Sequence, residues 1–391
     1  MQTIINNRFV RLPIYLPVFL FCMVLVIPMV RRYFMDLGYR WLYMLLLSFA
    51  VSFCLTPICG WLAKRLNIFD RPDSRKIHVA ATPLLGGAAV FAAFLTAILI
   101  NGIFSVKLLS ILVASGLLFA VSLADDRREV SAGIKLLAQI ACSVLVMGFG
   151  IVLKVVPDYL GAIGQVGNYV LTLFWIIGIT NAMNFFDGMD GLASGLGAII
   201  SFFLGWVAFQ TAQPFLGWIA VAMLGSCLGF IPYNFRRNGK ALIFLGDGGS
   251  IVIGFILACV AVYGDWAEAS PLVALASPVL IFWVLIFDMI HITVDRFLTG
   301  KVLNLRQWIE YVGKDHLHHR IAYALGGQKK SVLFIYLLSF CLGASALLIR
   351  NAGLFDAVLL LLQASIFVVL ITILERRGRT MAMENGLNDP S

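Results

Sequence analysis

Long apolar runs separated by short polar segments recur from one end of the 391-residue chain to the other. A helix needs about 17 to 25 residues with few charges to cross a bilayer. The pattern therefore predicts an all-α integral membrane protein, a polytopic bundle of about 11–12 transmembrane helices. The candidate segments lie near residues 12–30, 41–63, 84–104, 108–124, 134–153, 168–183, 190–211, 215–232, 249–263, 271–291, 331–349 and 354–374. The segments at 168–183 and 249–263 are short and need tilt or neighbouring protein to span.

The composition agrees with this pattern, since 61% of the residues are hydrophobic and only 13% are charged. Soluble globular domains carry about twice that share of charged residues. We interpret residues 1–391 as a single integral membrane domain. The apolar run at 12–30 ends at Arg31 and Arg32 without a small-residue cleavage site, so we expect an uncleaved first helix.

Basic residues are divided unevenly between the two sides of the predicted bundle. With twelve spans, 23 of the 29 Lys and Arg residues fall on one side, which the positive-inside rule makes cytoplasmic. The exceptions are Arg31, Arg32, Arg40, Lys107, Lys154 and Arg350. The three arginines between 31 and 40 fit the rule poorly. The pattern predicts a multi-pass protein of the inner or plasma membrane, whose net charge of +9 favours anionic lipid or substrate and not nucleic acid.

Carboxylates also gather on the predicted cytoplasmic side. Asp125 and Asp126 are adjacent at the end of one apolar segment. Two acids beside hydrocarbon are costly unless a cation or a basic group compensates them, and Mg²⁺ takes oxygen ligands and bridges phosphates. The alternative is a solvated loop start that Arg127 and Arg128 neutralise.

A second acidic cluster lies between two apolar segments and reads Asn184-Phe-Phe-Asp187-Gly-Met-Asp190-Gly191. In a helix, Asn184 with Asp187, and Asp187 with Asp190, would share a face. A helix that starts near Gly191 would offer free N–H groups to a phosphate. Turn chemistry between two helices is the alternative.

The run Phe244-Leu-Gly-Asp247-Gly248-Gly-Ser250 opens a further segment with an acid among glycines. Asp247 is the best single candidate for a metal ligand. Residues Gly248 to Ser250 would let the backbone approach a diphosphate closely. An aspartate that only caps the helix would explain the same residue without any chemistry.

The longest predicted cytoplasmic loop carries three of the five histidines, His316, His318 and His319, with Lys314 and Arg320 beside them. These donors suit a pyrophosphate or a leaving nucleotide. A zinc site is the rival interpretation, although three histidines within four residues are cramped for one tetrahedral ion.

The loop at 64–83 is basic as well and includes Lys76 and His78. It leads to Gly86 and Gly87 at the entrance of the next segment. Its cations would hold a lipid phosphate at the membrane surface, or would only anchor the loop on the cytoplasmic side.

In order along the chain, these clusters resemble the polyprenyl-phosphate N-acetylhexosamine-1-phosphate transferases of the MraY and WecA type. The motifs are Asp-Arg-Pro…Arg-Lys-x-His…Pro-x-x-Gly-Gly, Asp-Asp-Arg, Asn-x-x-Asn-x-x-Asp-Gly-x-Asp-Gly-Leu, Gly-Asp-Gly-Gly-Ser and His-x-His-His. The resemblance covers about residues 41–350 and leaves the helices near 12–30 and 354–374 outside that core. The His-x-His-His spacing looks more like the WecA branch than the branch that transfers phospho-MurNAc-pentapeptide in peptidoglycan synthesis.

The resemblance implies transfer of a sugar-1-phosphate, expected to be GlcNAc-1-phosphate, from a UDP-sugar to undecaprenyl phosphate. UMP is released, a lipid-linked cell-surface glycan is initiated, and Mg²⁺ is the implied cofactor, with Mn²⁺ as the alternative ion. Catalysis is assigned to Asp125, Asp126, Asp187 and Asp190, and the metal to Asp247 and Asp187. Substrate binding is assigned to Lys76, Lys135, Asn184, His316, His318, His319 and Arg320. Asp288 resembles a further family acid that precedes the histidine loop.

Several alternatives stay open from the sequence. The acceptor phosphate attacks either directly or through a covalent intermediate on an aspartate. A secondary transporter is the rival class, but its polar residues should cluster near the membrane midplane. An intramembrane prenyltransferase expects Asp-Asp-x-x-Asp, whereas position 129 is Glu. The expected partners are the two substrates and membrane lipid, and a homodimer is left open.

Overall fold

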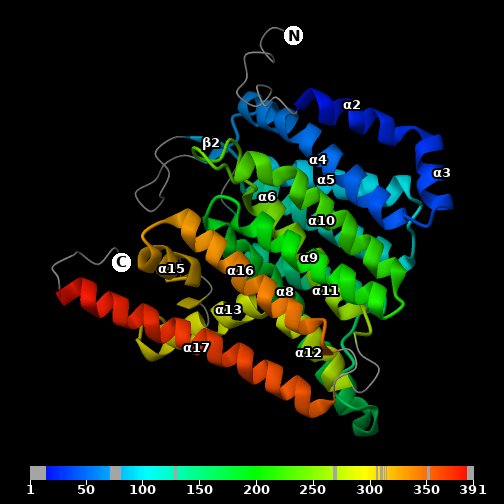
Figure 1. The fold of residues 1–391 in the computed structure, drawn as a ribbon. Helices are drawn as coiled ribbons and strands as arrows, with labels where there is room; N and C mark the ends of the chain where they lie inside the picture. Colours follow the sequence, from blue (N-terminus) through cyan, green and yellow to red (C-terminus); the bar gives the residue numbers. More distant parts are fainter. Residues whose placement is uncertain are drawn as a thin grey trace. The chain divides into compact units, whose positions relative to one another are not determined.

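The structure is a computed structural model that describes residues 15–70, 81–126, 130–266, 271–304, 307–308, 311, 313, 315–349 and 353–384. The chain divides into two compact units. The first unit holds residues 1–153 and 169–264, and the second holds residues 154–168 and 265–391. Almost all of the described elements are helices (Figure 1).

The first unit contains most of the helices and one short hairpin. Its helices are α2 (Tyr15–Val26), α3 (Pro28–Asp36), α4 (Arg40–Arg65), α5 (Gly86–Ile100), α6 (Val106–Asp125), α7 (Ala132–Gly148), most of α8 (Gly161–Phe185), η2 (Phe186–Gly188), α9 (Leu192–Gln210), α10 (Pro214–Asn234) and α11 (Gly246–Tyr263). Strands β1 (Phe69–Asp70) and β2 (Thr82–Pro83) pair antiparallel. Helix α11 is almost completely buried, so it forms the centre of this unit.

The second unit contains the remaining helices. They are η1 (Asp158–Leu160), the first turns of α8, α12 (Pro271–Ile281), α13 (Trp283–Leu298), α15 (Leu317–Leu325), α16 (Gln328–Ala346) and α17 (Leu354–Glu384). Many apolar side chains of α17 are exposed, among them Leu362, Ile366 and Leu370. Such a face suits contact with lipid hydrocarbon.

Each of the twelve predicted segments corresponds to a helix or to a bent pair of helices. Among the described residues, eight helices are long and apolar enough to cross a membrane, and two bent pairs pass the same test. The shorter apolar helices α5 and α7 occupy the remaining two positions. The prediction of an all-α polytopic membrane protein is confirmed, and the segments at 168–183 and 249–263 belong to helices of 25 and 18 residues.

The two bends are a feature that the apolar pattern did not predict. Helices α2 and α3 meet at 75°, and residues Val273–Ile281 meet α13 at 81°. Pro28 opens α3, and Pro278 lies four residues before the second break. Proline lacks an amide donor and clashes with the preceding turn, which ends or bends a helix.

Glycines bring α5 and α11 into backbone contact. A Cβ atom at Gly249 would lie 2.6 Å from the Cα atom of Gly87, so neither position tolerates a side chain without movement. A Cβ atom at Gly248 would meet the ring of Phe119 at 3.1 Å. The expectation that Gly248 to Ser250 offer backbone to a diphosphate is therefore wrong, because these residues are buried against neighbouring helices.

Candidate active site

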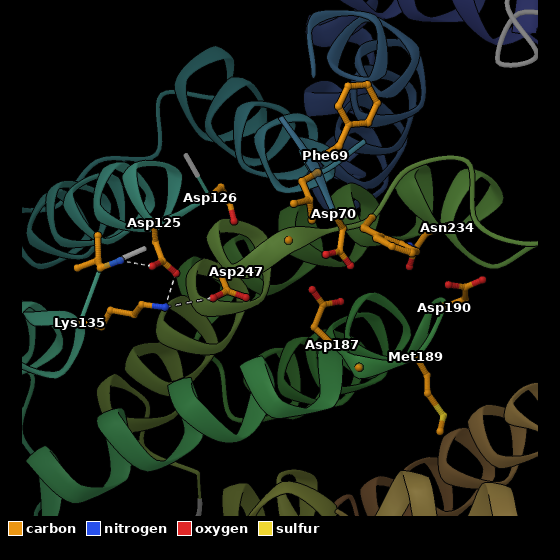
Figure 2. Close-up of a pocket in the computed structure, with 15 residues that line it drawn as sticks. Phe69, Asp70, Asp125, Asp126, Lys135, Asp187, Met189, Asp190, Asn234 and Asp247 are labelled. Carbon is orange, nitrogen blue, oxygen red and sulfur yellow. Dashed lines mark hydrogen bonds and ion pairs between the residues drawn. The ribbon is translucent and has the colours of Figure 1, made fainter. Parts of the chain in front are cut away.

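A pocket of about 610 Å³ lies in the first unit, where the loops after α6 and α8 meet the start of α11. Figure 2 shows Asp70, Asp126, Asp187 and Asp247 pointing toward a common space. The aspartates in its lining are Asp70, Asp125, Asp126, Asp187, Asp190 and Asp247. Among the described lining residues, the only lysine or arginine is Lys135. We call this site the acidic pocket.

Asp125 and Lys135 form an ion pair at one side of the acidic pocket. Asp125 is the last residue of α6, and its other carboxylate oxygen accepts a hydrogen bond from the Val130 amide at 2.8 Å. Lys135 lies in the first turn of α7, and its Nζ is 3.7 Å from Oδ2 of Asp247. One ammonium group therefore bridges two carboxylates that are far apart in the sequence.

Asp126 follows Asp125, but fewer positive or hydrogen-bonding groups offset the negative charge of its carboxylate. No side-chain hydrogen bond or ion pair to its carboxylate is found within the described residues. Burial, together with the charges of Asp247 and Asp125, raises the pKa of Asp126 to about 7. Burial and nearby negative charge both disfavour the ionised form of a carboxyl group. The two adjacent acids thus have different electrostatic environments.

Asp247 lies in the first turn of α11 and is oriented by an asparagine of α8. The Nδ2 group of Asn184 donates to Oδ1 of Asp247 at 3.1 Å and to Oγ of Ser250 at 3.0 Å. Asn184 thus contacts the predicted metal ligand directly. In this arrangement the amide of Asn184 fixes an acid, whereas the sequence interpretation assigned it to substrate.

The Asp-Gly-x-Asp-Gly segment forms a turn between helices. Asp187 lies in η2 and accepts a hydrogen bond from the Gly246 amide, while Asp190 Oδ2 accepts one from the Ala241 amide at 2.9 Å. The predicted shared helical face of Asp187 and Asp190 is wrong, because α8 ends at Phe185. The predicted helix start is confirmed, since α9 begins directly after Gly191.

Gly191 and Asn234 hold this turn in place. Gly191 has φ +82°, and a Cβ atom there would lie 2.5 Å from Phe235, so the position requires glycine. Oδ1 of Asn234 accepts a hydrogen bond from the Gly191 amide at 2.8 Å, and its Nδ2 donates to the Ile243 carbonyl at 3.0 Å. The turn and the segment before α11 are therefore fixed to each other.

The predicted histidine loop belongs to the second unit, where residues 315–320 form what we call the histidine segment. Nδ1 of His316 lies 2.8 Å from Oδ2 of the fully buried Asp288, and the Leu317 amide donates to its Oδ1 at 2.7 Å. Arg296 donates to both oxygens of Asp315 at 2.8 and 2.9 Å. Asp288 lies in the first half of α13 and not at the end of its helix, because the span expected at 271–291 bends before it.

The three histidines do not share one environment. His318 is 1% exposed, and burial lowers its pKa well below the usual value, helped by the charges of His319 and His316. His319 is only half-buried, and its ring centroid lies 4.2 Å from that of His318. His318 was predicted as a substrate-binding donor like the other two histidines, and the structure shows that its side chain packs inside the segment. Lys314, like Lys76 of the loop at 64–83, lies outside the described residues.

Comparison with known proteins decides the family. The family model described as Glycosyl transferase family 4 matches residues 108–265. A probable undecaprenyl-phosphate N-acetylglucosaminyl 1-phosphate transferase of Bacillus subtilis is 30% identical over 332 residues, which cover 83% of this chain and 89% of that protein. The chain belongs to glycosyl transferase family 4.

Two other relatives of this family-4 protein support the same family and the same reaction class. A decaprenyl-phosphate N-acetylglucosaminephosphotransferase of Mycolicibacterium smegmatis is 32% identical, with 83% of this chain and 87% of that protein covered. An undecaprenyl-phosphate alpha-N-acetylglucosaminyl 1-phosphate transferase of Escherichia coli K12 is 28% identical, with 73% and 77% covered. The predicted family and its reaction class, phosphoglycosyl transfer, are confirmed.

Two residues of this family-4 site were missed by the sequence interpretation. Asp70 ends β1 and lines the acidic pocket, although its loop was interpreted only as a basic surface for lipid phosphate. Asn234 ends α10, and it is 3% exposed. A polar side chain at the end of an apolar segment was the available signal, because such groups are buried only when hydrogen-bonded.

The acidic pocket fits a divalent cation by its charge. Within the described part of the chain, no three His, Cys, Asp or Glu side chains are arranged as a preformed metal centre. The lining nevertheless carries six carboxylates against one ammonium group. Carboxylate oxygens are the preferred ligands of Mg²⁺, and a bound cation would offset this repulsion.

Proposed function

We propose that this protein transfers GlcNAc-1-phosphate from UDP-GlcNAc to undecaprenyl phosphate and releases UMP. The observation that carries the proposal is the surplus of carboxylates around Lys135 in a family-4 transferase. The printed names of the relatives support the acceptor lipid and the sugar. The product would initiate a lipid-linked glycan of the cell surface.

We further propose Mg²⁺ as the cofactor, with Mn²⁺ as a substitute. Asp247 and Asp187 would hold the ion, because both point into the acidic pocket (Figure 2). The side chain of Asn184 orients Asp247. When bound, such an ion neutralises charge on a diphosphate and on the departing phosphate. Burial, and after it the charges of Asp247 and Asp125, raise the pKa of Asp126, and a bound cation would offset that part of the increase that comes from the neighbouring carboxylates.

The protein groups themselves would bind and orient the two phosphates. An oxygen of the lipid phosphate attacks the β-phosphorus of the UDP-sugar, and the bond from that phosphorus to the UMP oxygen breaks. Asp126 is suited to accept the proton of the acceptor phosphate, because no described side chain holds its carboxylate. Lys135 holds Asp125 and approaches Asp247, and it would also attract phosphate oxygens. A covalent phospho-aspartate remains the alternative route.

The cytoplasmic side of the membrane is the proposed place of this reaction. The excess of Lys and Arg on that side of the predicted topology supports this location. His316, His319 and Arg320 remain predicted phosphate donors, and Lys76 remains a predicted contact for the lipid phosphate. Soluble UDP-sugar and membrane-confined acceptor would meet at the surface, where proximity supplies much of the acceleration.

The test is transfer of label from radioactive UDP-GlcNAc to undecaprenyl phosphate by the purified full-length chain, with and without Mg²⁺. Asp247→Ala should abolish both UMP release and lipid-linked label. Asp36→Ala is the matched control, because Asp36 is an exposed acid of α3 outside the acidic pocket. Turnover with a different UDP-sugar would change only the specificity. Failure of a folded protein with every UDP-sugar would refute the transferase and favour a transporter.

A further inference from the structure

Arg31, Arg32 and Arg40 lie at the end of the first unit that is remote from the acidic pocket. Helix α5 starts beside the pocket at Gly86 and ends at Ile100, and its 15 residues extend over about 22 Å. Arg31 and Arg40 both contact the far end of this helix. The proposed transfer reaction gives these arginines no role, and they are exceptions to the positive-inside rule.

The two guanidinium groups converge on the last carbonyls of α5. Arg31 donates a hydrogen bond to the Ile100 carbonyl, and Arg40 donates one to the Asn101 carbonyl. Arg40 also lies over the ring of Trp218 in α10, with its Cζ 4.1 Å from the ring centroid. Two cations, Arg31 of α3 and Arg40 of α4, therefore lie together where α5 ends and α10 passes. We call this place the arginine corner.

This corner has a surplus of positive charge. No carboxylate is paired with Arg31 or Arg40 within the described residues. Arg31 lies close enough to Arg40 to repel it electrostatically. A helix C-terminus contributes only about half of a negative charge, which is less than two guanidinium groups require. The remaining guanidinium donors of the exposed Arg31 can bind an anion in the planar manner that phosphate favours.

The surroundings place this corner at the level of lipid headgroups. Tyr33, Tyr39 and Trp41 are exposed beside the arginines. Tyrosine and tryptophan concentrate where the hydrocarbon of a membrane meets water. Met29 of α3 and Leu37, which directly follows α3, are exposed as well, so the same surface offers apolar contact to an acyl chain.

We propose that Arg31 and Arg40 bind the phosphate of an anionic phospholipid, in the leaflet opposite the acidic pocket. A water-soluble phosphate ester shares this chemistry, but the exposed aromatic and apolar residues favour the lipid. The site is independent of the transfer reaction. It gives a role to two of the three arginines that occupy the side of the membrane that usually carries few of them.

Native mass spectrometry of the full-length chain in detergent tests this site directly. The chain is titrated with phosphatidylglycerol, with phosphatidylcholine of the same acyl chains, and with inorganic phosphate. We expect one tightly bound phosphatidylglycerol that phosphatidylcholine and phosphate do not displace. Arg31→Gln should weaken this site about tenfold, because charge-assisted hydrogen bonds to one guanidinium are lost. Arg31→Lys should retain an intermediate affinity, since it keeps the charge without the planar fork.

Lys107→Gln is the matched control, because Lys107 lies at the same end of the unit but over the Tyr263 ring. This variant should bind phosphatidylglycerol as the unaltered chain does. An equal loss of phosphatidylglycerol affinity in Lys107→Gln and Arg31→Gln would show that binding depends only on general surface charge, and it would overturn the proposal. Equal affinity for both lipids, or displacement by millimolar phosphate, would overturn it as well.

Discussion

The acidic pocket of the first unit and the histidine segment of the second unit both contain carboxylates with little access to solvent, yet they compensate that charge differently. In the histidine segment, burial alone would raise the pKa of Asp315, but the hydrogen bonds and charge of Arg296 lower it. In the acidic pocket, burial and the charges of Asp247 and Asp125 raise the pKa of Asp126 to about 7. The carboxylates of the histidine segment are paired within the fold, whereas the acidic pocket has an excess of negative charge.

This difference separates residues that build the fold from residues that await a ligand. Asp288 fixes the start of α15 through His316 and the Leu317 amide, so its charge is already used. Lys135 is the only lysine or arginine in the described lining of the acidic pocket, and it serves both Asp125 and Asp247. We therefore expect stability to depend on the pairs of the histidine segment and activity to depend on the surplus acids.

The largest expected effect on stability comes from breaking the Arg296–Asp315 pair. Arg296→Met leaves Asp315 half-buried without its bidentate partner, and loss of one member of a buried pair costs about 3–5 kcal/mol. Thermal unfolding should show a decrease in Tm that added Mg²⁺ does not reverse. The double variant Arg296→Met with Asp315→Asn should recover much of the loss. A Tm equal to that of the unaltered protein would show that this pair carries no stability.

Asp247→Asn should reduce activity most among the pocket variants. The amide keeps the size of the side chain but removes the negative charge proposed to hold the cation, and we expect about 10²- to 10³-fold lower kcat in the transfer assay. The Tm without Mg²⁺ should stay the same or rise, because one repelling carboxylate is gone. Transfer at the original rate would remove Asp247 from the reaction.

Lys135→Met should have a smaller but measurable effect on transfer. It removes the ammonium group shared by Asp125 and Asp247, and we expect roughly 10- to 100-fold lower kcat/KM. Lys107→Met serves as the control, because it removes a lysine from the opposite end of the same unit. Should both variants lose activity equally, the role assigned to Lys135 would be wrong.

The last prediction concerns the pH dependence of stability. The pKa of Asp126 is raised from 3.8 to about 7 in the folded protein, so the folded state binds more protons than the unfolded state between these values. The contribution of Asp126 to stability therefore decreases as pH rises from about 4 to 7. Without divalent ions, the Tm of Asp126→Asn should decrease less over this range than that of the unaltered chain. Identical pH profiles would contradict the raised pKa.

The apolar pattern predicted the helices well because each long charge-poor run must be helical within a bilayer. It did not predict the two bends, since Pro28 and Pro278 lie inside runs whose composition is continuous. The start of α9 was predicted near Gly191, which has a positive φ and directly precedes the helix. Helix positions thus depend on local sequence, whereas their bends depend on single residues.

The sequence also identified most acids of the pocket, but not what each one contacts. Asp125, Asp126, Asp187, Asp190 and Asp247 were all predicted, and the structure brings them to one cavity. The pairing of Asn184 with Asp247, and of Asp190 with the Ala241 amide, joins residues at least 51 positions apart. Such contacts depend on tertiary packing, which no local pattern records. The same limit explains why the burial of His318 was not foreseen.

Titration with Mn²⁺, followed by electron paramagnetic resonance of the free ion, tests the central contrast most directly. The unaltered chain should bind one Mn²⁺ that Mg²⁺ displaces. Asp247→Asn should lose this binding, whereas Asp288→Asn should retain it, because Asp288 is already paired with His316. Absence of Mn²⁺ binding by the unaltered chain, or equal binding by Asp247→Asn, would contradict the assignment of the acidic pocket as a cation site.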